Sequence, residues 1–201
     1  MKIKICGLTD PKEAAYLNTY QADFAGFILF YPGSKRNNTI AQAKEIMREL
    51  APSIKRVAVA VSPTEAQIRQ ITEAGFDYIQ IHGKLSQDLL STISLPVLRA
   101  FNVKNMEEYA QYGSQPQIAG YIFDAAQPGS GATFDWNLLR QIPRDEKLLF
   151  LAGGLHSGNV TQAIQAVRPD GVDVSSGVEY DNASGKDPDK IKKFISRARN
   201  A

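Results

Sequence analysis

Short hydrophobic runs recur along the whole chain, and segments with the period of a helix follow them. The runs are the length of strands and rich in β-branched residues: KIKIC, FAGFILF, RVAVAV, YIQIH, PVLRAF, GYIFD, LLFLAG and GVDVSS. The helix-period segments are DPKEAAYLNTY, TIAQAKEIMREL, SPTEAQIRQITEA, SQDLLSTI, NMEEYAQY, FDWNLLRQI, HSGNVTQAIQAV and DPDKIKKFISRA. Strands that alternate with helices are typical of a parallel sheet.

Eight such units in 201 residues predict a closed (β/α)₈ barrel, the TIM barrel, with eight parallel strands. The competing fold is an open doubly wound sheet, but KICGLTDPKEA holds one glycine instead of the usual G-x-G-x-x-G turn. No linker, low-complexity stretch or charge block interrupts the pattern, so we expect a single domain over residues 1–201. Pro11, Pro63 and Pro188 are expected in the first turns of helices, where the missing amide costs nothing.

Alternation along each strand predicts which side chains face the barrel interior. Small and polar side chains are expected inside: Lys4 and Cys6, Ala58 and Ala60, Gln80 and His82, Asp173 and Ser175. The apolar residues between them are expected to face the helices: Ile3 and Ile5, Val57, Val59 and Val61, Ile79 and Ile81, Val172 and Val174. We interpret Lys4 and Asp173 as a structural ion pair rather than as catalytic groups.

Composition and charge narrow the class of partner. Hydrophobic residues make up 43% and charged residues 22%, with a net charge of +2 and both signs interspersed. These values are ordinary for a soluble protein and favour neither a nucleic acid nor a membrane surface, so we expect a small-molecule partner. The lone cysteine excludes an internal disulfide, and no signal peptide or membrane-length apolar run is present, which predicts a cytoplasmic protein.

Two glycine-rich stretches follow the seventh and eighth predicted strands, where this fold commonly holds a phosphate group. They are LAGGLHSGNV and DVSSGVE, and we assign a phosphate to Gly153, Gly154, Ser176 and Gly177. Glycines at strand-to-helix turns also occur for geometric reasons alone. The presence of both stretches in the expected pair of loops favours the phosphate site.

Cys6 and Asp124 end the first and sixth predicted strands, at the same rim of the barrel. A lone cysteine in an apolar strand is commonly a small core residue. At the mouth, however, a thiol that neighbouring dipoles help to ionise can remove a proton from carbon, and a carboxyl group opposite can donate one. An acid and a base on either side of a phosphate-anchored sugar suggest an isomerase.

Other polar residues give weaker signals. Arg36 is either an ordinary solvated charge or a rim residue that holds a carboxylate with its guanidinium fork. The segment QPGSGATFDW, with Gly129, Ser130 and Gly131, lacks the lysine of a nucleotide-binding loop and is either a flexible lid or a plain connection. His82 and His156 are isolated, so we expect no metal.

Several of these motifs, in this order, resemble phosphoribosylanthranilate isomerase of tryptophan biosynthesis. They are KICGLT, IHG, FD with GSGATFDW, LAGGL with NV, and GVDVSSGVE with GKD. The resemblance extends from the first strand to the last helix. It implies a (β/α)₈ barrel that converts N-(5-phosphoribosyl)anthranilate to 1-(2-carboxyphenylamino)-1-deoxyribulose 5-phosphate by an Amadori rearrangement, without a cofactor.

The resemblance also implies residue roles. Cys6 matches the general base, Asp124 the general acid, Arg36 the partner of the anthranilate carboxylate, and the two glycine loops the phosphate cradle. The segments SKRNNT and RVAVAVS differ from the family pattern, which more typically has a proline before the arginine and a phenylalanine at the end of the third strand.

Three alternatives are weaker. Indoleglycerol-phosphate synthase would need catalytic lysines at strand ends, and the histidine-pathway isomerase would use an aspartate in place of Cys6. A barrel that only binds a phosphorylated metabolite would need neither Cys6 nor Asp124. A closed barrel satisfies its own core, so we expect a monomer, with a helix-face dimer as the alternative.

Overall fold

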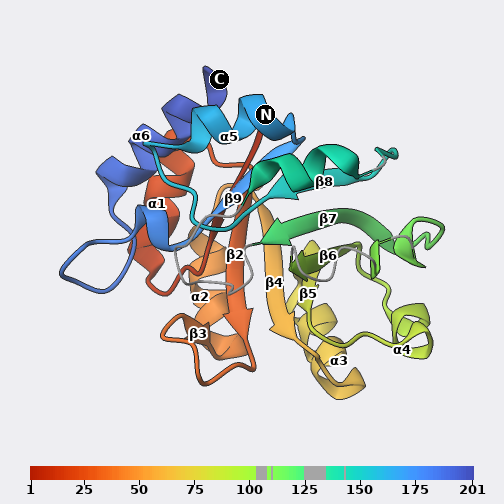
Figure 1. Cartoon of the computed structure of the whole chain (residues 1–201). Coiled ribbons are helices and arrows are strands. Elements are labelled where there is room, and N and C mark those ends of the chain that lie inside the picture. The colour runs from red at the N-terminus through yellow and green to blue at the C-terminus, as the bar shows by residue number, and fades with distance from the viewer. Residues whose placement is uncertain (103–107, 110, 125–134, 143) are drawn as a thin grey trace.

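Eight parallel strands close into a barrel in the computed structural model, which describes residues 1–102, 108–109, 111–124, 135–142 and 144–201 (Figure 1). The barrel strands are β1 (Lys2–Cys6), β2 (Phe24–Leu29), β4 (Lys55–Val61), β5 (Tyr78–His82), β6 (Val97–Asn102), β7 (Ile118–Asp124), β8 (Leu148–Leu151) and β9 (Gly171–Val174). Each lies within, or overlaps, one of the eight predicted runs. Because β1 pairs with both β2 and β9, the sheet has no free edge among these strands, and the barrel prediction is confirmed.

One further strand, β3 (Asn37–Asn38), was not predicted. It pairs with the end of β2, outside the closed ring. Asn38 is buried, and its side-chain amide donates to the Leu8 carbonyl at 2.8 Å. This contact fastens the segment after β2 to the turn after β1.

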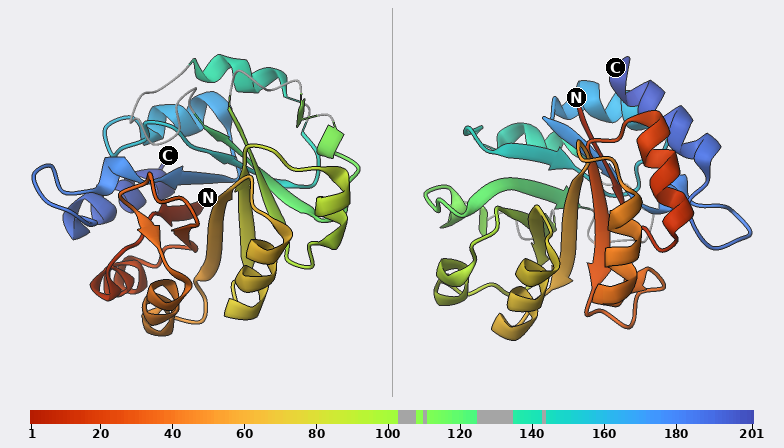
Figure 2. Two further views of the ribbon diagram at one scale, coloured as in Figure 1. Left: turned by 90° about the horizontal axis from the view of Figure 1, so that it is seen from below. Right: turned by 180° about the vertical axis from the view of Figure 1, so that it is seen from behind.

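Helices lie around the outside of the strands (Figure 2). They are α1 (Pro11–Tyr20), α2 (Ile40–Glu49), α3 (Glu65–Ala74), α4 (Gln87–Thr92), α5 (Val160–Val167) and α6 (Pro188–Arg199), with the 3₁₀ helices η2 (Trp136–Gln141) and η3 (Ser176–Val178). Asp10, Thr39 and Thr64 each form a capping box at the start of a helix, which satisfies amides that have no partner within the helix.

Two predictions about helices need correction. Pro11 and Pro188 begin α1 and α6 as expected, but Pro63 precedes the N-cap Thr64 and lies outside α3. The segment FDWNLLRQI forms the 3₁₀ helix η2 rather than an α-helix, and its cap Asp135 accepts from the Asn137 amide. Of NMEEYAQY, the structure describes residues 108–109 and 111–112, which also have 3₁₀ geometry.

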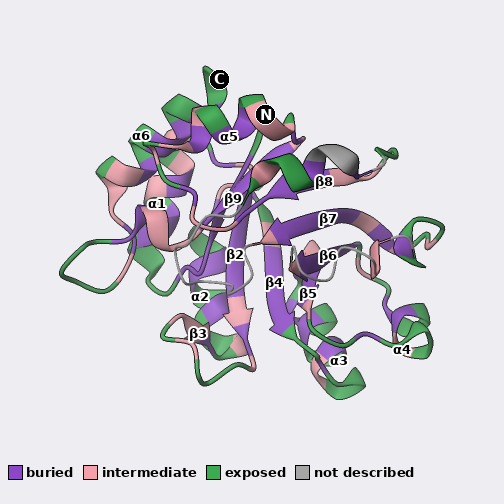
Figure 3. Ribbon diagram, in the orientation of Figure 1, coloured by how far each residue is buried: buried purple, intermediate pink, exposed green. Residues whose placement is uncertain are grey.

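Apolar side chains form two separate cores, and buried residues follow the strands of the barrel (Figure 3). The outer core, between strands and helices, includes Ile3, Ile5, Ile79, Ile81, Val172 and Val174, as predicted. The inner core fills the barrel and includes Cys6, Phe24, Val57, Val59, Leu98, Ile122 and Phe150. Large apolar side chains therefore occupy the barrel interior below the mouth, as is usual in this fold.

The predicted orientation of β4 is wrong. Val57 and Val59 face the barrel interior, whereas Ala58 and Ala60 belong to the outer core with the helices. Every residue of VAVAV is apolar, so alternation in polarity could not set the phase of this strand. The structure places the larger side chains in the barrel, where there is volume to fill, and the smaller ones beneath the helices.

No helix in the described part of the chain is long and apolar enough to cross a membrane.

Candidate active site

A cavity of about 1070 Å³ opens at the carboxyl ends of the strands. The strands and the turns just after them contribute Cys6, Val61, His82, Asn102, Asp124, Ala152 and Ser175 to its lining. Enzymes with this fold carry their active sites at this face. The cavity is therefore the candidate active site, and most of the residues singled out in the sequence line it: Cys6, Arg36, Asp124, Gly153, Gly154 and Ser176.

Cys6 is the last residue of β1 and is 7% exposed. It pairs with Gly26 on β2, and a Cβ atom at Gly26 would lie 2.8 Å from the Cys6 Sγ and 2.9 Å from the Lys4 Nζ. The sulfur and the ammonium group thus border the same small gap, which exists because position 26 has no side chain. Any larger residue there must displace one of the two groups.

Lys4 and Asp173 form a buried ion pair beneath the thiol. The Lys4 Nζ lies 3.0 Å from both carboxylate oxygens, and the two residues face each other across the β1–β9 pairing. Burial alone would lower the pKa of Lys4, but Asp173 and Cys6 together outweigh it and hold the pKa above its ordinary value. Lys4 therefore carries a positive charge beside Cys6 at neutral pH. The predicted ion pair with Asp173 is confirmed.

The surroundings of Cys6 favour the neutral thiol. Burial raises its pKa above the ordinary value, the Lys4 charge opposes that rise, and the Asp173 carboxylate adds to it. From the sequence we expected neighbouring dipoles to help the thiol ionise, but the net effect of its surroundings is to raise its pKa. In the unliganded chain the sulfur is therefore protonated at neutral pH.

Asp124 ends β7 and is half-buried. In the sheet, β9 and β8 separate β7 from β1, so Asp124 and Cys6 reach the cavity from strands that are three positions apart. A small molecule in the cavity can therefore contact a thiol and a carboxyl group that come from different parts of its wall.

The loop after β8 has a backbone that requires glycine. Gly153 and Gly154 have φ angles of 84° and 63°, in the left-handed region. Their amide N–H groups donate no hydrogen bond to any described residue, while Asn159 Nδ2 donates to the Gly154 carbonyl at 3.0 Å. The loop thus brings to the cavity wall two amides that have no partner among the described residues, which suits an anion.

Gly177 has a different position. It does not line the cavity, and a Cβ atom there would lie 2.0 Å from the Leu155 carbonyl oxygen. Because Gly177 has no side chain, the loop after β9 can pack directly on the loop after β8. The predicted lid residues Gly129, Ser130 and Gly131 lie outside the described residues.

Arg36 lines the cavity from the segment between β2 and β3. Its Nε and Nη2 donate to the two carboxylate oxygens of Glu179, the second at 3.2 Å. The side chain also lies across the turn after β1, where a Cβ atom at Gly7 would come within 2.6 Å of the Arg36 Cδ. Arg36 is therefore fixed against the β1 turn and the loop after β9.

Comparisons with known proteins identify the family. Residues 3–197 match the profile of N-(5'phosphoribosyl)anthranilate (PRA) isomerase. The chain belongs to this family. It is similar to N-(5'-phosphoribosyl)anthranilate isomerase of Streptococcus gordonii, with 38% identity over 98% of this chain and 97% of the relative.

Solved structures agree with this assignment. Phosphoribosyl anthranilate isomerase of Thermotoga maritima covers 100% of both chains at 34% identity, with a TM-score of 0.88. A second structure of a phosphoribosyl anthranilate isomerase, in complex with reduced 1-(o-carboxyphenylamino)-1-deoxyribulose 5-phosphate, also covers 100% of both chains at 34% identity, with a TM-score of 0.83. These likenesses place the barrel and its order of strands within the phosphoribosylanthranilate isomerase family.

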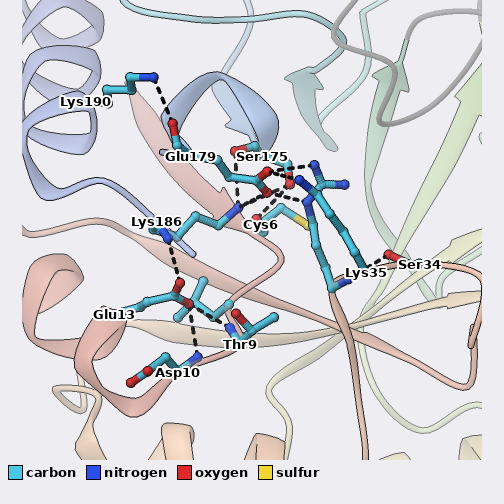
Figure 4. A network of polar contacts seen from close by, with 12 residues as sticks. Cys6, Thr9, Asp10, Glu13, Ser34, Lys35, Ser175, Glu179, Lys186 and Lys190 are labelled. Atoms are coloured by element: carbon cyan, nitrogen blue, oxygen red, sulfur yellow. Dashed lines mark hydrogen bonds and ion pairs between the residues drawn. The ribbon is translucent and has the colours of Figure 1, made fainter. Parts of the chain in front are cut away.

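Three residues around the site of this isomerase had no role in our sequence-based predictions. Glu179 and Lys186 are both buried and joined at 3.2 Å, and Ser175 Oγ donates to the Cys6 carbonyl at 3.0 Å (Figure 4). Glu179 and Lys186 lie in the motifs GVDVSSGVE and GKD. A loop pattern does not tell buried charges from exposed ones, so their pairing is visible only in the structure.

The two histidines differ in environment. His82 lines the cavity, where Gln80 Nε2 lies 2.8 Å from its Nε2. Burial and the charges of Lys4 and Arg99 lower its pKa to about 4, so it is neutral at physiological pH. His156 Nδ1 accepts from the Gly158 amide at 3.1 Å, before α5.

Among the described residues, no group of three or more potential ligands is placed to hold a metal ion.

Alkylation of Cys6 tests the direction of its pKa. Only the thiolate reacts with iodoacetamide, so the alkylation rate rises with pH as the thiol ionises. We expect the pH midpoint of this rise to be higher for Cys6 than for a cysteine in an unstructured peptide. The chain has one cysteine, so the modified mass reports this residue alone. A midpoint at or below that of the peptide would contradict the upward shift.

Substitution of Gly26 tests the gap between Cys6 and Lys4. Gly26→Ala should lower isomerase turnover by about tenfold or more, because overpacking of this kind costs roughly 1–3 kcal/mol and displaces the thiol. Gly33→Ala is the matched control, since a Cβ atom there meets nothing within 4 Å. Circular dichroism should show both variants folded. Equal turnover in the two variants would refute the importance of the gap.

Proposed function

We propose that this member of the isomerase family converts N-(5-phosphoribosyl)anthranilate to 1-(2-carboxyphenylamino)-1-deoxyribulose 5-phosphate, with Cys6 as general base and Asp124 as general acid. The observation that carries the proposal is the position of these two groups, at the ends of β1 and β7, in the wall of one cavity. Family membership supports the reaction, and the cavity supports the residue roles.

The first step opens the sugar ring. Asp124 donates its proton to the furanose ring oxygen as the bond from that oxygen to C1 breaks. The lone pair of the anthranilate nitrogen forms a double bond to C1, which gives a protonated Schiff base and a hydroxyl group on the sugar. A carboxyl group is suited to this step because it can hold a proton beside a basic oxygen and release it as the oxygen takes it up.

The second step moves a proton from carbon. Cys6 first loses its thiol proton to water, and the resulting thiolate takes the proton from C2. The electrons of that C–H bond form the C1–C2 double bond as the π electrons of the iminium move to nitrogen, leaving an enolamine. Tautomerisation, with a proton added at C1 and one lost from the C2 hydroxyl group, yields the ketone. Carbon C2 is oxidised and C1 reduced within one molecule, so the reaction is an aldose-to-ketose isomerisation, an intramolecular oxidoreduction that consumes no external redox partner.

A raised thiol pKa is compatible with this role. A thiolate formed from a group of high pKa is a stronger base toward carbon than one of low pKa. The cost of forming it in a buried position is reduced by the Lys4 ammonium group on the other side of the Gly26 gap. We therefore assign Lys4 an electrostatic part in stabilising the thiolate, in addition to its ion pair with Asp173.

The two ends of the substrate have separate binding regions in this proposal. The sugar phosphate binds the amides of Gly153 and Gly154 together with Ser176, all in the cavity wall. Gly177 supports the cradle by packing one loop on the other. Arg36 binds the anthranilate carboxylate.

Single substitutions test the acid and the base. Cys6→Ala and Asp124→Asn should each lower kcat by about 10²–10⁴-fold, the range expected for one proton-transfer group. Loss of substrate fluorescence measures turnover, and binding of a reduced product analogue should remain. Asp88→Asn on the exposed surface of α4 is a matched control that should keep full activity. Normal turnover in both site variants would reject the assignment.

We also propose that residues 1–201 act as one barrel domain in the cytoplasm, as a monomer. The closed sheet and the helices around it satisfy the core without a second copy. Light scattering after size-exclusion chromatography should give the mass of one chain, 22.1 kDa, across a range of concentrations. A mass of two chains at low micromolar concentration would overturn this proposal.

A further inference from the structure

Glu179 holds one edge of the Arg36 guanidinium group from behind the cavity wall. Arg36 lines the cavity, whereas Glu179 does not, and Glu179 is only 8% exposed. The carboxylate takes the donors Nε and Nη2, and Nη1 donates to none of the described residues. A guanidinium group bound in this side-on manner keeps its other edge for a second carboxylate.

The backbone of Glu179 is fixed on both sides. Its amide donates to the Ser176 carbonyl at 3.1 Å, and its own carbonyl accepts from Lys190 Nζ at 2.9 Å. An isolated antiparallel bridge pairs Glu179 with Lys186, so the loop after β9 folds back on itself there. The carboxylate therefore has a rigid support, which a positioning residue needs.

Lys186 anchors the same carboxylate from the other side (Figure 4). Its Nζ lies 3.2 Å from Glu179 Oε1 and 3.2 Å from the Ser175 carbonyl, and its side chain is fully buried. Its backbone amide donates to Glu13 Oε1 at 2.7 Å, while Glu13 Oε2 accepts from the Thr9 amide at 2.7 Å. The support of Glu179 thus extends to the turn that follows β1.

Three cations face the carboxylate of Glu179, and one of them, Arg36, lines the cavity. Arg36, Lys186 and the exposed Lys35, at 2.8 Å, all face this one carboxylate. Burial would raise its pKa, but these cations lower it to about 2, so Glu179 is ionised at physiological pH. The carboxylate therefore orients Arg36 while Lys35 and Lys186 share its negative charge.

We propose that Glu179, braced by Lys186, is a positioning residue that sets the guanidinium of Arg36 so that its free edge receives the substrate carboxylate. This inference rests on the role proposed for Arg36 above. Glu179 acts through Arg36 and not on the reacting atoms. Its effect is therefore expected on recognition of the carboxylate, since Glu179 does not line the cavity in which the proton transfers take place.

The test compares two substrates that differ only in that carboxylate. For Glu179→Gln, kcat/KM with N-(5-phosphoribosyl)anthranilate should fall by about tenfold or more, mainly through KM, since a charge-assisted contact is lost. With the phosphoribosylated aniline that lacks the carboxylate, kcat/KM should change by less than about twofold. An equal loss on both substrates, or no loss on either, would overturn the proposal.

Two further variants guard against a general structural effect. Glu179→Asp keeps a negative charge near the buried Lys186 but withdraws the carboxylate by one methylene from both Lys186 and Arg36, which share Oε1. It should therefore fold and show the same selective loss. Glu65→Gln removes the carboxylate of an exposed glutamate–arginine pair on α3 and should leave both substrates unaffected. Circular dichroism and the thermal midpoint report folding for each variant.

The outcomes separate this inference from the proposed function. If the unaltered chain does not isomerise the anthranilate substrate, the proposed function fails. If Arg36→Ala leaves the ratio of kcat/KM for the two substrates unchanged, the proposed role of Arg36 is wrong, and this inference is wrong with it. If Arg36→Ala removes the preference in kcat/KM for the substrate with the carboxylate, but both Glu179 variants keep that preference, the inference alone is wrong.

Discussion

A buried ion pair between Lys4 and Asp173 joins the first barrel strand to the last, and the geometry of the mouth is built on it. The pair is almost completely removed from water, where each charge alone would be costly. A buried pair of this kind adds little net stability, but loss of one partner costs about 3–5 kcal/mol. It therefore fixes the closure of β1 on β9 and at the same time keeps a cation beside Cys6.

The strands, and several residues that line the cavity, could be predicted from the sequence, because both depend on local patterns. Each apolar run had the length of a strand, and Cys6 and Asp124 stood at strand ends where parallel strands share one rim. The phase of β4 could not be predicted, since Val57 and Ala58 are both apolar and only the packing volume on each face distinguishes them. Pro63 was misplaced for a different reason. The capping box of Thr64 and Gln67 sets the start of α3 one residue after the proline.

The supporting residues of the site were beyond the reach of sequence patterns. Glu179 and Lys186 contact groups that are distant in the chain, such as Arg36 and the backbone of Ser175, and no spacing rule encodes those contacts. The direction of the Cys6 pKa is another example, since it depends on burial by the inner core and on two charges of opposite effect. Position on a strand indicates that a thiol can reach a substrate, while its ionisation depends on the assembled surroundings.

The order of the strands has a consequence for folding. Lys4 and Asp173 are 169 positions apart, and Ser175 and Lys186, which contact the Cys6 carbonyl and Glu179, come later still. During synthesis, β1 leaves the ribosome long before its neighbour β9 is made, so Lys4 has no Asp173 to pair with for most of that time. Contacts of such long range close slowly. The Lys4–Asp173 ion pair and the Ser175–Cys6 contact therefore need a chain made as far as its last barrel strand, and a shorter nascent chain lacks both.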